Sequence, residues 1–160
     1  VNRVGGPRMK EARKAFQGIS IGEAKFTPSF DHNKVRYVIH AVGPVFRDNA
    51  LNQDPIEIKY GQLRSAYRNA LRCAYELQCD SIAFCLISAG VFRGSVPLET
   101  IISLGIEGIF DFYRDDATND FPPSEEVVSS SAKSLPSKIF LCAYTVEEQQ
   151  ALELVVSNLP

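Results

Sequence analysis

The chain has 160 residues, of which 45% are hydrophobic and 22% charged, and its formal net charge is −2 at pH 7. These values are typical of a single globular domain with a substantial core, and the weak negative charge gives no electrostatic reason to expect a nucleic-acid partner. No apolar run is long enough to cross a membrane, and no signal-peptide pattern opens the sequence.

The first third of the chain predicts one helix and two strands. Residues 7–16 begin with a proline and carry an apolar side, and Gly18 ends this helix. Residues 24–27 and 35–42 have the composition of strands, with a turn cluster between them and Gly43-Pro44 after the second. The short connection between the two strands predicts an antiparallel pair.

The middle of the chain predicts two long helices around a strand. After a polar loop over residues 46–55, apolar residues recur at helical spacing from Pro55 to Leu77, and again over residues 98–113. The expected inner residues of the second helix are Leu98, Ile101, Ile102, Gly105, Ile109 and Phe112. Between the helices lies a continuous apolar strand over residues 82–87, which is typical of a parallel sheet covered on both faces.

This apolar strand runs directly into Ser88-Ala89-Gly90, which is followed by Phe92 and Gly94. Ligands of open α/β sheets bind beyond the carboxyl ends of the strands. A loop of small residues there lets the backbone approach a ligand, and a helix that begins just beyond favours an anion such as a phosphate. An ordinary strand-to-helix turn is the alternative, because one glycine-containing loop is a weak motif.

The last third of the chain changes composition at residues 115–137, which are rich in serine and proline and predict a flexible insertion into a single domain of residues 1–160. A final strand over residues 139–144 follows. Thr145 and Glu148 have the spacing of a capping box for a closing helix over residues 146–159. The inner residues expected in that helix are Leu152, Val155, Val156 and Leu159.

The order of these elements predicts an α/β fold with helices on both faces of a sheet. Four strands are few for such a sheet, so we expect that strands upstream of the first helix are missing from this chain. The four cysteines match no zinc spacing. We expect buried thiols in a reducing, intracellular compartment, the cytoplasm or the nucleus, rather than disulfides or metal ligands. These cysteines are Cys73, Cys79, Cys85 and Cys142.

Five segments, in this order and spacing, resemble a macro domain: GPRMKEARKAF, GEAKFTPSF, YVIHAVGP, SIAFCLISAGVFRG and IFLCAYTVEE. The resemblance covers the whole chain apart from the serine- and proline-rich insertion, and the combination is specific although each segment alone is weak. It implies a three-layer α/β/α fold with a mixed sheet, and binding of ADP-ribose or related nucleotides in a cleft above the strand ends. It also implies no metal and no cofactor, and we expect a monomer.

By the same resemblance, Ser88, Ala89, Gly90, Val91 and Phe92 correspond to the family's phosphate-binding loop, in which backbone amides hold the diphosphate and the aromatic lies against the distal ribose. Tyr144 corresponds to a position that often stacks on adenine; a core or rim tyrosine is the alternative. Arg93 departs from the family, in which a small residue is commoner, and it either reaches a phosphate or points to solvent.

The family's acidic residue for adenine, its ribose-binding asparagine and its first glycine-rich loop lie upstream of the GPRMKEARKAF match. Asn2 is one candidate for that asparagine, but a gapless alignment instead places residues 1–7 after the first loop. The catalytic residues are therefore unknown in this chain. His40 lies inside a strand with no orienting partner at a recognisable spacing, so we expect a hydrogen-bonded core residue rather than a base.

Three functions follow as hypotheses. The first is binding of ADP-ribose, free or attached to a protein, through residues 88–92. The second is hydrolysis, on the same fold, of a mono-ADP-ribosyl linkage or of an ADP-ribose derivative. The third is a degenerate macro-like scaffold that binds no nucleotide. A shared fold does not decide between them.

Overall fold

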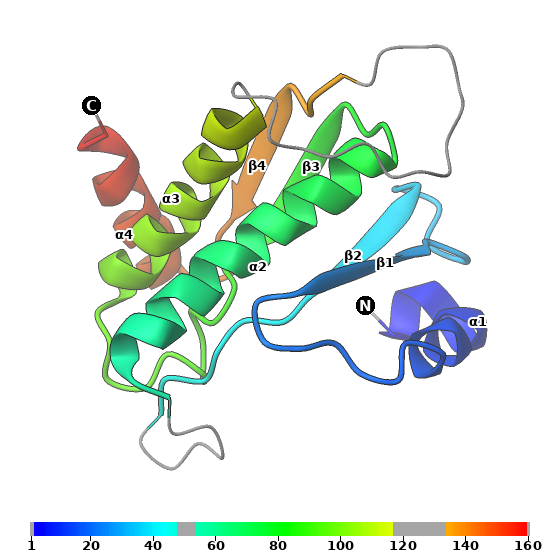
Figure 1. The fold of residues 1–160 in the computed structure, drawn as a ribbon, viewed down its shortest axis with the longest axis horizontal. Coiled ribbons are helices and arrows are strands. Elements are labelled where there is room, and N and C mark those ends of the chain that lie inside the picture. Colours follow the sequence, from blue (N-terminus) through cyan, green and yellow to red (C-terminus); the bar gives the residue numbers. More distant parts are fainter. Residues whose placement is uncertain (1, 48–53, 117–133, 160) are drawn as a thin grey trace.

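The computed structural model describes residues 2–47, 54–116 and 134–159 as four helices and four strands (Figure 1). In chain order they are α1 (Asn2–Lys14), β1 (Ala24–Pro28), β2 (Tyr37–Ala41), α2 (Ile56–Glu76), β3 (Ser81–Cys85), α3 (Leu98–Asp116), β4 (Lys138–Cys142) and α4 (Val146–Ser157). The α/β class and the order of elements are those that the sequence predicts. Most of the predicted insertion at residues 115–137 lies outside the described residues.

The strands form two separate pairs in the described residues. β1 and β2 are antiparallel, with Ala24 opposite Ala41, as the short connection between them predicts. β3 and β4 are parallel, with Ser81 opposite Lys138. β2 and β3 do not pair with one another, so the described strands do not form one continuous sheet. Among the described elements, α2 alone contacts strands of both pairs (Figure 1).

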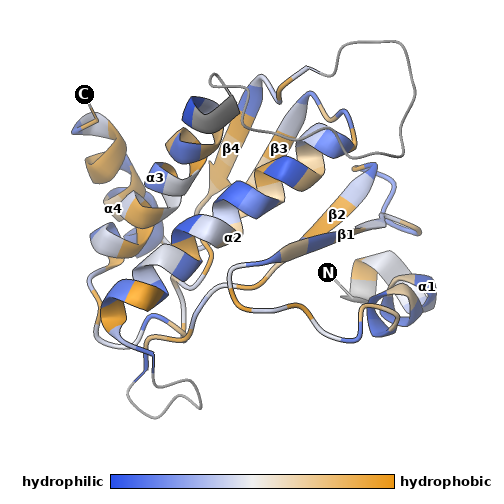
Figure 2. Cartoon of the chain, viewed as in Figure 1, coloured by the Kyte–Doolittle hydropathy of each residue, from blue (hydrophilic) through white to orange (hydrophobic). Residues whose placement is uncertain are grey.

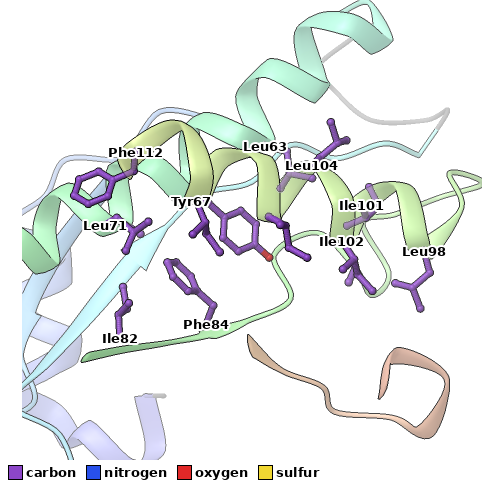
Figure 3. Close-up of a cluster of buried hydrophobic side chains, with 14 of the residues drawn as sticks. Leu63, Tyr67, Leu71, Ile82, Phe84, Leu98, Ile101, Ile102, Leu104 and Phe112 are labelled. Carbon is purple, nitrogen blue, oxygen red and sulfur yellow. The ribbon is translucent and has the colours of Figure 1, made fainter. Parts of the chain in front are cut away.

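The core lies between α2, α3 and β3 (Figure 3). Tyr67 of α2 packs on Phe84 of β3 with their ring centroids 5.0 Å apart, and Phe112 of α3 is fully buried. Gly105 lets α3 approach closely, because a Cβ at this position would lie 2.8 Å from the Tyr67 ring. The predicted inner face of α3 is confirmed, since its five large apolar residues are all buried.

The two outer helices match the prediction less completely. α1 is kinked at Gly6, whose φ of 71° is non-helical, and Pro7 begins its second part. The capping box of α4 is present as predicted, with Thr145 as N-cap and Glu148 at the third position. Of the expected inner residues of α4, Leu152 and Val155 pack against the core. The prediction is wrong for Val156 and Leu159, which are exposed.

One face of the β3–β4 pair is uncovered in the described part of the chain. Ile82 and Phe84 point into the core, whereas the alternate residues Ala83 and Cys85 are exposed, and Phe140 and Cys142 of β4 are exposed as well. Figure 2 shows the apolar character of both strands. The expected cover on both faces is therefore wrong here, and so is the expected burial of Cys85 and Cys142.

The described helices were also compared with the requirements of a membrane span. None of them combines the length and the apolar character that crossing a bilayer needs.

Candidate functional site

The segment after β3 is held by contacts from three other parts of the chain. The backbone amide of Ile87 donates a hydrogen bond to the Tyr67 hydroxyl of α2 at 2.9 Å. The hydroxyl of Ser88 donates to the carbonyl of Pro44 at 2.8 Å, and the amide of Phe46 donates to the carbonyl of Phe92 at 2.7 Å. The loop is therefore fixed on α2 and on the segment that follows β2, far away in sequence.

Two glycines permit this close approach. Gly43 lies so near the loop that a Cβ there would collide with the Ser88 hydroxyl and the Ile87 side chain. Gly94 has a φ of 62°, and a Cβ there would lie 3.0 Å from the Cα of Arg47. Ser88 itself has a φ of 60°, an uncommon conformation for a residue other than glycine. Its hydrogen bond to Pro44 helps to hold this conformation.

The middle of the loop presents backbone donors outward. Gly90, Val91 and Phe92 are exposed, and within the described residues their amides donate to no protein acceptor. Gly90 has open space at the position a side chain would take, with nothing within 4 Å. Consecutive exposed N–H groups can hold an anion, and α3 begins just beyond at Leu98.

Arg93 takes neither of the two positions that the sequence suggests. Its guanidinium folds back on the loop and donates to the carbonyls of Ala89 at 3.2 Å and Val96 at 3.1 Å. It also forms an ion pair with Glu147 of α4 at 3.5 Å. Arg93 therefore braces the loop internally and links it to α4. Ala89, one of the predicted site residues, is buried beneath the loop.

Arg47 is a further cation beside the loop, and the sequence analysis did not identify it. Its guanidinium lies over the exposed ring of Phe92, 5.9 Å from the ring centroid. Such contacts are weak at exposed sites, so this side chain keeps the freedom to interact with a bound anion. Its position four residues before the masked loop gives no recognisable sequence signal.

Tyr144 lies at the same end of the strand pair as the loop. Because β3 and β4 are parallel and in register, the residues after Cys85 and after Cys142 leave the pair together. The Tyr144 side chain is 95% exposed, while its backbone amide donates to Glu148 at 2.6 Å. The alternative of a core tyrosine is wrong, and an exposed aromatic ring beside the loop is available for stacking.

Two cavities of about 480 and 310 Å³ lie between α3 and α4. Arg93 and Glu147 line the smaller one, but residues 88–92 and Tyr144 line neither. The predicted site is thus an open surface in the described residues, not an enclosed pocket.

His40 is placed as predicted, away from the loop. Its Nε2 lies 3.1 Å from the Thr27 hydroxyl on β1, and its ring packs on Phe16. Burial, followed by the nearby charge of Arg13, lowers the pKa of His40 from its ordinary value. His40 is therefore a hydrogen-bonded residue between β2 and α1.

Comparison with known proteins gives a consistent result. The family model described as "Macro domain" matches residues 1–102. A curated Macro domain-containing protein of Lactiplantibacillus plantarum is 34% identical over 104 residues, which are 65% of this chain and 56% of that protein. The chain spans between 50 and 62% of the length of the first three such relatives.

Solved structures share the fold. The macrodomain of Oceanobacillus iheyensis with ADP superposes with a TM-score of 0.74 at 18% identity, over 98% of this chain and 72% of that one. The Trypanosoma brucei macrodomain in complex with ADP-ribose gives a TM-score of 0.68 at 25% identity, over 96% of this chain and 53% of that one.

Proposed function

Because the chain belongs to the macro domain family, we propose that it binds ADP-ribose, free or attached to a protein, through residues 88–92 and Tyr144. The observation that carries this proposal is the run of three exposed amides at Gly90, Val91 and Phe92 with no protein acceptor among the described residues. Hydrogen bonds from N–H groups to a charged phosphate are stronger than those to neutral acceptors, and they suit a diphosphate.

The side chains around these amides support the same ligand. The exposed ring of Phe92 offers an apolar surface for a ribose, and Tyr144 offers one for a base. Arg47, held only by its contact with the Phe92 ring in the described residues, supplies positive charge beside the amides. The solved relative from Trypanosoma brucei was crystallised in complex with ADP-ribose, which provides the chemical precedent within the family.

The geometry favours binding over hydrolysis. Hydrolysis of an ADP-ribosyl linkage would need a base or a positioned water within hydrogen-bond reach of the reacting bond. The charged side chains with contacts to the described loop are Arg47, Arg93 and Glu147, and Glu147 is engaged by Arg93. We therefore expect binding without release of ADP-ribose from a modified protein, and a release assay tests this.

Gly90→Glu is the sharpest test of the binding proposal. The open space at Gly90 accepts a side chain without a clash, so the fold should remain intact while a carboxylate occupies the path of the diphosphate. Gly61→Glu is the matched control, because Gly61 on α2 also has nothing within 4 Å and lies outside the loop. Calorimetric titration with ADP-ribose should show binding by the wild type and the control only.

A second variant separates the adenine contact from the diphosphate contact. Tyr144→Ala removes an exposed ring, so the unfolding temperature should not change. Loss of stacking should weaken ADP-ribose binding by about tenfold, which corresponds to about 1.4 kcal/mol. No heat of binding from folded wild-type protein, or equal binding by Gly90→Glu, would instead favour a scaffold that binds no nucleotide here.

A further inference from the structure

Two free cysteines face one another on the uncovered side of the β3–β4 pair. Cys85 ends β3 and Cys142 ends β4, and the parallel register places them directly opposite. Side chains of opposite residues in neighbouring strands project from the same face of a sheet. Both cysteines are free and exposed. No other pair of the four cysteines occupies opposed strand positions.

The spacing of the two strands is compatible with a covalent bond between these residues. Neighbouring strands lie about 4.8 Å apart in the hydrogen-bonding direction. Disulfides join residues whose Cα atoms are about 4.4–6.8 Å apart, so strands at this spacing need no large movement. We propose that Cys85 and Cys142 form a dithiol site that a small disulfide such as glutathione disulfide converts into an intramolecular disulfide.

The reaction is a pair of thiol–disulfide exchanges. The thiolate of one cysteine attacks glutathione disulfide, forms a mixed disulfide and releases one reduced glutathione. The thiolate of the opposite cysteine then attacks the protein sulfur of that mixed disulfide and displaces the second glutathione. The two protein thiols are oxidised, one glutathione disulfide is reduced to two glutathione molecules, and the two thiol protons pass to the products.

The other two cysteines differ in their surroundings and serve as internal controls. Cys73 on α2 is buried, its thiol donates to the carbonyl of Ala24 at 3.7 Å, and burial raises its pKa to about 11. Cys79 is half-buried, and its thiol donates to the carbonyl of Leu77 at 4.0 Å. Buried thiols of raised pKa are poor nucleophiles, so glutathione disulfide should leave Cys73 unmodified.

The experiment treats the full chain with glutathione disulfide, blocks the remaining thiols, and measures the intact mass and the peptide map. The expected product has lost two hydrogens, carries no glutathione and contains a Cys85–Cys142 peptide. Cys85→Ser and Cys142→Ser should each retain one glutathione on the remaining exposed cysteine. Cys73→Ser should react as the wild type does. Wild-type protein that stays reduced, retains glutathione, forms only dimers or links other cysteines would overturn the proposal.

A probe that involves no oxidation gives a second readout. Phenylarsine oxide condenses with two adjacent thiols, forms two arsenic–sulfur bonds and releases water. We expect one arsenical per wild-type chain, and none retained by Cys85→Ser or Cys142→Ser after dilution. Retention that does not depend on these two residues would contradict the assignment. Neither readout uses a nucleotide, so the result is independent of the proposed binding function.

Discussion

The hydroxyl oxygen of Tyr67 accepts a hydrogen bond from the backbone amide of Ile87 at 2.9 Å. Tyr67 comes from the centre of α2 and is only 1% exposed, and its burial raises the pKa of the hydroxyl well above the ordinary value. The hydroxyl therefore stays neutral at all physiological pH values. A core residue thus sets the point at which the candidate binding loop leaves β3.

Tyr67→Phe tests this relationship. The variant keeps the ring contact with Phe84 but leaves the Ile87 amide without its acceptor, so we expect a loss of about 1–3 kcal/mol in the free energy of unfolding. Binding of ADP-ribose should weaken as the loop loosens. Urea unfolding and calorimetry measure the two effects. Tyr60→Phe is the matched control, since the Tyr60 ring packs on Phe46 while its hydroxyl has no acceptor or donor among the described residues.

Gly43→Ala should disturb the loop from below. The new methyl group would collide with the Ser88 hydroxyl and the Ile87 side chain, and Ser88 could no longer reach the Pro44 carbonyl in its present rotamer. Overpacking of this kind costs about 1–3 kcal/mol. Thermal unfolding should show a lower midpoint for Gly43→Ala than for Gly90→Ala, whose methyl group meets nothing within 4 Å. Equal midpoints would contradict the close packing of Gly43 under the loop.

Arg93→Met should weaken ADP-ribose binding although Arg93 is not placed to touch the ligand. The variant keeps the aliphatic stem but removes the hydrogen bonds to the carbonyls of Ala89 and Val96, so the loop loses its internal brace. Partly exposed ion pairs contribute little, so Glu147→Gln should change stability by less than about 0.5 kcal/mol. If both variants weaken binding equally, the link to α4 rather than the brace shapes the loop.

Acidification should destabilise the fold through His40. Its pKa in the folded protein lies below the ordinary value of 6.5, because burial and Arg13 disfavour the imidazolium. The unfolded chain therefore binds the proton more tightly. The stabilisation from neutral His40 is fully present above pH 6.5 and is lost as the pH falls from there toward the lowered pKa. Chemical unfolding across this range should show a steeper loss for the wild type than for His40→Gln.

Much of the fold could be predicted from local signals in the sequence. The helical period of α2 and α3, the Thr145 and Glu148 capping pair, and the β-branched strand before Gly43 each depend on neighbouring residues alone. Exposure could not be predicted in the same way. Cys85, Cys142 and Val156 are apolar positions in regular elements, and whether such positions are covered depends on the packing of distant parts of the chain.

The candidate loop could be predicted in position but not in construction. Small residues after an apolar strand indicate Ser88–Gly90 directly. The residues that hold the loop come from α2 and from the segment after β2, and none has a sequence motif: Tyr67 has the spacing of an ordinary core residue, and Pro44 and Phe46 contribute only backbone atoms. The role of Arg93 depends on the curvature of the loop, which the sequence does not encode locally.

The position of α2 between the two strand pairs has a consequence for cooperativity. Since α2 alone contacts both pairs among the described elements, local opening of β1 and β2 need not disrupt β3 and β4. Amide hydrogen exchange would then divide the molecule into two units of different opening free energy, with α2 and β3 in the more protected one. The ligand loop draws contacts from both units, so a bound nucleotide would slow exchange in each and bring their opening free energies together.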